Sequence, residues 1–364
     1  MNYIKTFDPR ILLGDRLGLT LYAMFVEAYL GGDYRNEARL YEKFIDHFPG
    51  ERGVHSPENF VSLIESTKLG GFNPYHPVYA NPTEYVLKQG SHRCSVAVQL
   101  GIQEVPYILR FDDNRTDDSV FEKVFSSSEL RLLEEKREEY IERCDPLTAL
   151  KCRLRIHMRA HVESYQAAFS SKTKVPALRF YQAYEPLDIR GKRPSQKRLE
   201  IYNLARYVRP SFSALEAGCN VGFFALALSS HVSSVDGFEV DPNYVQVAGE
   251  VSGHCRISNC SFSVDSVQHF HARQPYDLVI STAVHGWSQL PFPEYVSSVD
   301  RWTKPGGLIL FESHEIDAER DWPEKKAFLA NRFELLEAGF IDDVDNEVYA
   351  SEMREFLVLR KREA

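Results

Sequence analysis

The first part of the chain follows the apolar pattern of amphipathic helices. Apolar residues recur every three or four positions, the spacing of one helix face, over residues 17–30, 35–48 and 56–68. Strand-like pieces follow, and the helical pattern then returns. Ser126 and Glu129 have the spacing of a capping box, which predicts a helix to about residue 144. A further helix is expected over residues 147–169.

From about residue 176 the pattern changes to short β-rich runs separated by helical ones. The runs are SALEAG, VSSVDGFEV, CSFSVD, YDLVIST and GGLILFES, and then RFELLEAGFID and REFLVLRKR. Strands that alternate with helices predict a parallel, doubly wound sheet, and the last two runs favour an antiparallel pair at its edge. We therefore expect an α+β domain over residues 1–120, a helical connector over 121–175 and an α/β domain over 176–364.

The composition agrees with a globular protein of two domains. Of its residues, 43% are hydrophobic and 26% charged, as in globular proteins. Its length of 364 residues is more than one ordinary hydrophobic core accommodates. The apolar stretch at 17–30 contains Glu27 and lacks the layout of a signal peptide, so we expect no membrane span and a cytoplasmic location. Six cysteines without a CxxC pair predict reduced thiols and no metal site.

A basic segment stands out against the net charge of −9. Residues 151–210 hold 14 lysines and arginines against 4 acids. Such a segment in an acidic protein suggests an anionic ligand nearby, which includes nucleic acid. A solvated helical face that is neutralised by acidic neighbours explains the same count.

The stretch LEAGCNVGFFALAL, residues 215–228, predicts a ligand-binding turn. An apolar strand carries Glu216, the chain turns on Gly218 and Gly222, and a helix begins near residue 221. Glycine lets the backbone approach a ligand, and the first N–H groups of the helix are free to bind it. Further along, Glu239 ends a second strand, where a carboxylate can accept both hydroxyls of a ribose, and Asp265 follows a third strand.

This order of motifs resembles the class I S-adenosylmethionine-dependent methyltransferases over residues 180–362. The resemblance implies a seven-stranded Rossmann-like sheet and S-adenosyl-L-methionine as the cofactor. It places the cofactor against Glu216, Gly218, Cys219, Asn220, Gly222, Glu239, Asp265, Ser266 and Ser281. A cofactor without a pyrophosphate does not demand a third glycine, and the Asn220 amide can bind its amino-acid end. A dinucleotide dehydrogenase is the rival interpretation, but the GxGxxG spacing is missing.

Candidate catalytic residues follow the fourth and fifth strands. A hydroxyl acceptor needs a base within reach, and His285, Glu312 and His314 are the candidates, although either histidine could be structural. Trp287 either walls the acceptor site or belongs to the core.

The segment that precedes the glycine turn carries two further arginines. Residues 180–208 resemble the lead-in of one branch of these enzymes, which includes RNA wobble-uridine and small-molecule methyltransferases. Arg193 and Arg198 in this lead-in either help to close the crevice or form surface salt bridges.

A second glycine turn, in QGSHRC, predicts an anion seat in the first domain. A strand ends at Gly90, Ser91 caps a helix, and Arg93 lies in its first turn. This segment resembles the ParB/sulfiredoxin superfamily, some members of which bind nucleotides and act as kinases or nucleotidases. The resemblance implies a phosphate or nucleotide site, for ATP or a related nucleotide, at Gly90, Ser91, His92 and Arg93. A non-catalytic domain that presents the substrate is the alternative.

The leading hypothesis is a methyltransferase that acts on a small phosphorylated or glycan-type hydroxyl acceptor. Three alternatives stay open. They are an RNA-modifying methyltransferase that uses residues 151–210, a bifunctional kinase-methyltransferase, and a nucleotide-binding regulator. The sequence predicts no oligomeric state.

Overall fold

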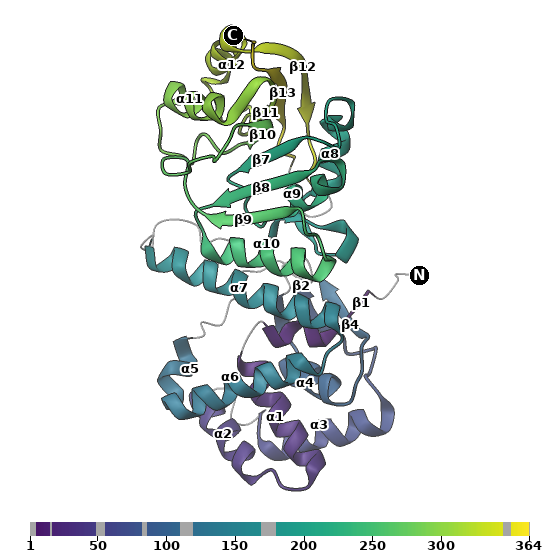
Figure 1. Cartoon of the computed structure of the whole chain (residues 1–364). Coiled ribbons are helices and arrows are strands. Elements are labelled where there is room, and N and C mark those ends of the chain that lie inside the picture. Colours follow the sequence, from purple (N-terminus) through teal and green to yellow (C-terminus); the bar gives the residue numbers. More distant parts are fainter. Residues whose placement is uncertain are drawn as a thin grey trace. The chain divides into compact units, whose positions relative to one another are not determined.

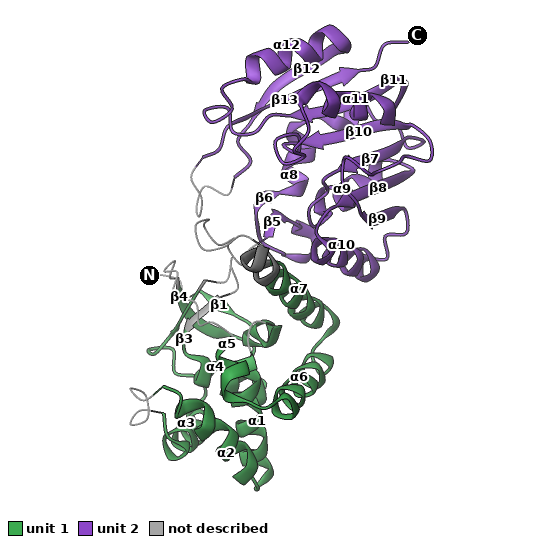
Figure 2. Ribbon diagram, turned by 90° about the vertical axis from the view of Figure 1, so that its left-hand side faces the viewer, with its two compact units in different colours: residues 1–178 green, residues 179–364 purple. Residues whose placement is uncertain are grey.

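The computed structural model describes residues 5–14, 17–48, 55–81, 86–109, 119–168, 180–344 and 351–363. The chain divides into two compact units, Met1–Leu178 and Arg179–Ala364, coloured separately in Figure 2. The helices that we predicted as a connector pack against elements of the first unit. The predicted boundary at residues 175/176 lies outside the described residues.

The first unit combines a small mixed sheet with several helices. Its strands have the order β1-β4-β2-β3, with bounds β1 Thr6–Phe7, β2 Val78–Asn81, β3 Val86–Gln89 and β4 Val105–Leu109. The helices are α1 Leu17–Gly31, α2 Arg35–Ile45, α3 Pro57–Gly70, α4 Ser91–Gln99, α5 Ser119–Val124, α6 Ser127–Glu142 and α7 Pro146–Ala168, with a 3-10 helix at Pro9–Gly14. The predicted helices are confirmed, as is the capping box of Ser126 and Glu129 at the start of α6. In the part of the chain that the structure describes, no helix is long and apolar enough to cross a membrane.

The second unit is built on a seven-stranded sheet of order β12-β13-β11-β10-β7-β8-β9 (Figure 1). The strands are β7 Ser213–Ala217, β8 Ser234–Glu239, β9 Cys260–Val264, β10 Tyr276–Thr282, β11 Thr303–Glu312, β12 Glu334–Ile341 and β13 Arg354–Arg360. β7 to β11 pair in parallel, whereas β13 pairs antiparallel with both β11 and β12. The predicted doubly wound sheet and its antiparallel edge pair are therefore confirmed.

Helices cover both faces of this sheet. The helices are α8 Ser195–Ile201, α9 Phe223–Leu228, α10 Pro242–Cys255, α11 Phe292–Trp302 and α12 Trp322–Arg332. On one face, α8 and α9 pack on alternate strand residues such as Ala214, Val235 and Leu310. On the other face, α11 and α12 pack on the intervening residues. A separate two-stranded parallel sheet of β5 Phe180–Ala183 and β6 Gly191–Pro194 precedes α8.

Strand alternation places three acids on a single face. Successive side chains of a strand point to opposite faces. Glu216, Glu239 and Glu312 are each an even number of residues from the strand residues that pack under α8 and α9. All three lie at or near the carboxyl ends of β7, β8 and β11, the edge at which doubly wound sheets bind ligands.

Candidate cofactor and active site

The turn between β7 and α9 contains three left-handed residues. Gly218, Asn220 and Gly222 have φ angles of 61°, 52° and 71°. Residues with a Cβ atom are strained in this region, and asparagine is among the few that tolerate it. The backbone therefore explains Asn220: the turn needs a third left-handed residue, and asparagine supplies it together with a polar side chain.

Neighbouring elements pack closely on this turn. A Cβ atom on Gly218 would lie 2.9 Å from both Cγ atoms of Val284, which follows β10. The helix begins at Phe223, whose N–H donates to Oε1 of the buried Gln182 at 2.9 Å. Sequence reasoning missed Gln182, because a lone glutamine in another strand carries no signal for helix capping.

Glu216 is a buried carboxyl group without a partner. The residue is fully buried, and neither carboxyl oxygen has a hydrogen-bond partner among the described residues. Burial raises the pKa of Glu216 to about 8, although the charge of Arg198 and the nearby Ala225 N–H oppose this effect. An unpaired buried polar group costs stability. Glu216 is therefore complementary to a cationic ligand group such as an ammonium.

Glu239 joins the end of β8 to the glycine turn. Its Oε2 accepts the Asn220 N–H at 3.0 Å, and its Oε1 accepts the Val240 N–H at 2.7 Å and the Asp241 N–H at 3.4 Å. Burial raises the pKa of Glu239, and these N–H bonds oppose the rise. The carboxylate thus lies at the carboxyl edge of the sheet, where ribose hydroxyls would share or replace the N–H contacts.

The remaining predicted cofactor residues differ in what they offer. Asp265 directly follows β9, and its Oδ1 accepts the Ser266 N–H at 2.7 Å, so both lie at the carboxyl edge. Cys219 is buried in the turn. Ser281 points to the opposite face, where its hydroxyl pairs with that of Tyr295 at 2.7 Å. The Ser281 side chain is therefore part of the core and does not lie on the face that carries the three acids.

These groups fit the parts of S-adenosylmethionine. The unpaired Glu216 carboxyl matches its ammonium group, and the Glu239 carboxylate matches its ribose hydroxyls. The Asn220 Oδ1 atom is buried and accepts no hydrogen bond from any residue that the structure describes. The three left-handed residues leave the backbone close to this space.

His285 and His314 come together beyond β10 and β11. Their ring centres are 4.7 Å apart. The carboxylate beside them is Glu319, whose Oε1 lies 2.5 Å from His285 Nε2 and whose Oε2 accepts the backbone N–H of His314 at 2.6 Å. We missed Glu319 in the sequence because it lies in a turn without helix or strand periodicity.

Trp287 lies beside this cluster and is 78% exposed. Its ring centre is 6.4 Å from that of His314. The interpretation of Trp287 as a core residue is therefore wrong.

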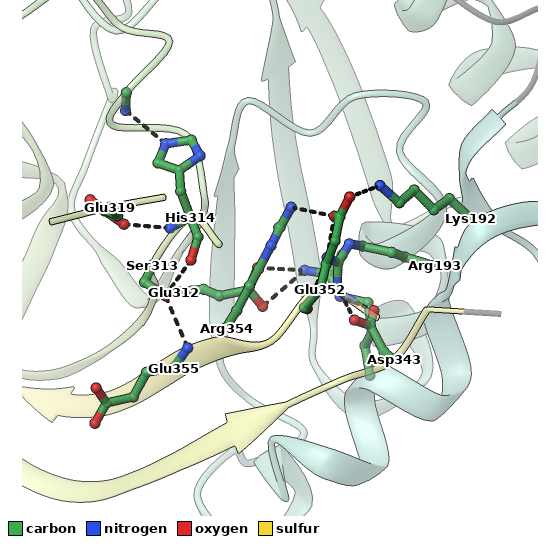
Figure 3. A network of polar contacts seen from close by, with 12 residues as sticks. Lys192, Arg193, Glu312, Ser313, His314, Glu319, Asp343, Glu352, Arg354 and Glu355 are labelled. Carbon is green, nitrogen blue, oxygen red and sulfur yellow. Dashed lines mark hydrogen bonds and ion pairs between the residues drawn. The ribbon is translucent and has the colours of Figure 1, made fainter. Parts of the chain in front are cut away.

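Glu312 belongs to a buried ion-pair network, drawn in Figure 3. Its carboxylate is fully buried and accepts from Arg354 Nη1 at 2.8 Å, from Arg198 Nη2 at 3.3 Å and from the Tyr202 hydroxyl. Against the effect of burial, the charges of Arg198 and Arg354 lower its pKa to about 2. Because its oxygens are engaged and it stays ionised, the structure assigns Glu312 to this network and not to proton transfer.

The two lead-in arginines belong to the same network. Arg193 and Arg198 are fully buried, so they are not surface salt bridges. Arg193 pairs with Asp343 and, at 3.0 Å, with Glu352, and Arg198 Nε lies 3.3 Å from Asp343. These pairs attach the lead-in of β6 and α8 to the segments that flank β12 and β13.

The predicted anion seat of the first unit surrounds the start of α4. Gly90 is the N-cap with φ 112°. The helix therefore begins after Gly90, and Ser91 is its first residue and not its cap. Arg93 Nη1 donates to the carbonyl oxygens of His76 and, at 3.2 Å, of Pro77. A cavity of about 280 Å³ is lined by Gly90, His92 and Arg93 together with Tyr41, His55, Asn59, Phe60, Leu63 and Gln89.

His92 is held as a neutral aromatic ring. It stacks between Tyr22 and His55, with ring centres 4.2 and 4.6 Å away, and its Nε2 is 2.8 Å from the Tyr41 hydroxyl. Burial lowers the pKa of His92 to about 3. His92 therefore brings no positive charge to the cavity at neutral pH, whereas the Arg93 guanidinium is positively charged.

No group of three or more potential metal ligands occurs among the described residues.

The family model described as a methyltransferase domain matches residues 214–307. The second unit therefore contains a methyltransferase domain. The matched region begins in β7 and includes the glycine turn, Glu239, Asp265 and His285.

Two curated relatives and several solved structures are similar to parts of this chain. Malonyl-[acyl-carrier protein] O-methyltransferase 2 of Ilyobacter polytropus is 28% identical over 104 residues, which are 28% of this chain and 39% of that relative. The chain thus spans well under two thirds of the length of this relative. The structure of the N-methyltransferase NodS from Bradyrhizobium japonicum is 19% identical in sequence and has a TM-score of 0.39. The match covers 46% of this chain and 94% of NodS. The structure of the [4+2]-cyclase SpnF is 16% identical in sequence and has a TM-score of 0.39. The match covers 45% of this chain and 81% of SpnF.

Proposed function

We propose that the second unit binds S-adenosylmethionine and transfers its methyl group to a hydroxyl acceptor. The observation that carries this proposal is the unpaired, buried Glu216 carboxyl beside a turn of three left-handed residues. The methyltransferase domain match over residues 214–307 supports the same cofactor. The cofactor would supply an electrophilic methyl group.

In this proposal each cofactor residue has one task. Glu239 holds the ribose hydroxyls, Asp265 and Ser266 meet the adenine edge, and Glu216 with Asn220 holds the amino-acid end. Methyl transfer is an in-line displacement, so positioning supplies much of the rate. A hydroxyl oxygen must also lose its proton, and His285 lies in the loop that contacts the turn.

The acceptor we propose is a small phosphorylated or glycan-type molecule with a hydroxyl group. The relative from Ilyobacter polytropus is named as an O-methyltransferase, which agrees with an oxygen acceptor. The exposed Trp287 ring beside His314 would pack against the apolar face of such a molecule.

A calorimetric titration with S-adenosylhomocysteine tests the cofactor assignment. Glu239→Ala removes the acceptor of the ribose hydroxyls, so we expect affinity to fall roughly 10- to 100-fold, about the cost of one hydrogen bond to a charged group. Glu334→Ala is the control, because Glu334 is an exposed acid of β12. Absence of binding to the wild-type chain, or equal binding to Glu239→Ala, would refute the proposal.

An RNA acceptor is the weaker alternative. Three arginines of the basic segment, Arg155, Arg193 and Arg198, are buried, and two of them pair with carboxylates. They are therefore not presented to a phosphate backbone. If RNA were the acceptor, its affinity for the full chain would fall steeply with added salt, and a flat salt dependence would exclude it.

For the first unit we propose a site for phosphate or a nucleotide at the cavity in front of α4, in line with the ParB/sulfiredoxin resemblance. The Arg93 guanidinium lines this cavity and would be the cation that binds the phosphate. A kinase activity of this unit would require that the cavity binds a nucleotide. Titration of ATP and of inorganic phosphate should give binding that Arg93→Gln abolishes; binding that survives this change would contradict the site.

A further inference from the structure

His285 lies in a closed environment next to the proposed cofactor turn. It is 5% exposed and packs against the rings of Phe292 and Phe311, with centres 5.5 and 5.4 Å away. The preceding residue, Val284, is the one that a Cβ atom on Gly218 would strike. His285 is thus one residue from direct contact with the glycine turn.

The bond to Glu319 determines which nitrogen of His285 carries the proton. Against the effect of burial, hydrogen bonds from His285 and Lys325 lower the pKa of Glu319 to about 2, so this carboxylate is ionised and only accepts. His285 Nε2, 2.5 Å away, must therefore donate. In a neutral imidazole the other nitrogen then has the free lone pair, and Nδ1 is buried without a partner in the described part of the chain.

His314 does not offer such a lone pair. Its Nε2 accepts the Gly286 N–H at 3.1 Å, so its protonated nitrogen is Nδ1. Burial and the neighbouring His285 lower the pKa of His314 to about 4, which keeps it neutral. Of the two histidines, only His285 presents a basic nitrogen that is not already engaged.

Charged groups around the pair hold Glu319 in place. Lys325 Nζ lies 2.8 Å from Glu319 Oε1 and 3.0 Å from Asp321 Oδ2. The other Glu319 oxygen accepts the backbone N–H of His314. Arg354 acts on His314 from β13. Glu319 is thus fixed from two elements, and through it the orientation of the His285 ring is fixed.

We propose that Glu319 is a positioning residue that holds His285 as the Nε2–H tautomer, so that Nδ1 removes the hydroxyl proton of the methyl acceptor. In this step the acceptor O–H bond breaks and its proton goes to Nδ1. The oxygen forms the new O–CH3 bond, and the S–CH3 bond breaks to leave the neutral thioether S-adenosylhomocysteine. The Glu319 carboxylate stabilises the imidazolium until it releases the proton to solvent. This inference rests on the proposed methyl transfer.

The tautomer is measured by nitrogen-15 NMR of the histidine-labelled full chain, with His285→Gln to assign the signal. We expect a neutral wild-type His285 with the proton on Nε2. In Glu319→Gln the anionic partner is lost, so His285 should protonate at lower pH and the preference for Nε2–H should weaken. Asp317→Asn is the control, because Asp317 is an exposed acid of the same turn, and it should change neither. An Nδ1–H tautomer in the wild-type chain would overturn the proposal.

Catalysis is measured as formation of S-adenosylhomocysteine with a panel of sugar phosphates and methyl glycosides. Glu319→Gln should lower kcat roughly 100-fold, in the range for loss of acid–base catalysis, with KM nearly unchanged. The acid limb of its pH profile should move to lower pH, because the imidazolium loses its stabilising charge, and Glu319→Asp should restore part of the rate. Equal kcat in Glu319→Gln would refute the positioning role. If wild-type chain binds S-adenosylhomocysteine but methylates none of the panel, the proposed acceptor class is wrong, and the NMR result still decides the tautomer.

Discussion

Replacement of Glu312 by glutamine separates a structural role from a catalytic one. The wild-type carboxylate is fully buried between Arg198 and Arg354. Its pKa of about 2, against an ordinary value of 4.5, corresponds to roughly 3 kcal/mol at 1.36 kcal/mol per unit. Removal of one partner from a buried ion pair costs a similar amount, about 3–5 kcal/mol. We therefore expect Glu312→Gln to lower the free energy of unfolding of the second unit by about 3 kcal/mol at pH 7.

Tryptophan fluorescence during urea unfolding reports this loss, because all three tryptophans, Trp287, Trp302 and Trp322, lie in the second unit. Glu334→Gln is the matched control: its pair with Arg360 is about half exposed, so its loss should cost less than about 1 kcal/mol.

The same reasoning sets the pH dependence. A lowered pKa contributes stability that is present above the unfolded value of 4.5 and is lost as the pH falls towards 2. The wild-type chain should therefore lose stability over this range by more than Glu312→Gln does. If Glu312→Gln unfolds at the wild-type urea concentration, the network does not stabilise the fold and the structural assignment of Glu312 is wrong.

Three further outcomes follow from the proposed cofactor and acceptor sites. Gly218→Ala places a Cβ atom against Val284 at a φ of 61°, so it should weaken S-adenosylhomocysteine binding at least 10-fold and cost about 1–3 kcal/mol. Gly253→Ala, in open space on α10, should do neither, and equal calorimetric and unfolding results for both variants would contradict this reasoning. Trp287→Ala should raise KM for the acceptor and leave the melting temperature unchanged, since the ring is exposed; a lower melting temperature would indicate a core role. Because Glu216 has a pKa of about 8, an ammonium group that binds beside it should displace its proton. Calorimetry at pH 7 in two buffers should therefore show proton release on binding of S-adenosylhomocysteine, and Glu216→Gln should lack this release. The affinity for S-adenosylhomocysteine should rise with pH up to about 8.

The succession of elements could be predicted from local patterns. Apolar periodicity indicated α1, α2 and α3 and the seven strands of the sheet, because each pattern is the direct result of burying one face of a helix or strand. The glycine turn was equally accessible, since Gly218 and Gly222 mark a backbone that other residues adopt only with strain. The acids at the strand ends followed from the rule that ligands bind at the carboxyl edge of such sheets.

Partner choice was not accessible in the same way. Glu312 and Glu319 are both acids near His314, yet Glu312 is 114 and 42 residues from the arginines that engage it, and Glu319 is 34 residues from His285. Gln182 caps a helix 41 residues away, and Trp287 is exposed although it is a large aromatic residue. Local sequence patterns do not predict these contacts, because the residues that make them are far apart in the sequence.

The amino-acid sequence by itself determined the order of the strands and helices, the left-handed turn and the acids that face the carboxyl edge, because short-range sterics and the burial of alternate residues decide these features. Only the tertiary structure decided which carboxylate is paired, which stays unpaired and which orients a histidine. The protonation and reactivity of a buried acid depend on the charges and N–H groups that the fold brings within a few ångströms of it, and those groups come from distant parts of the chain.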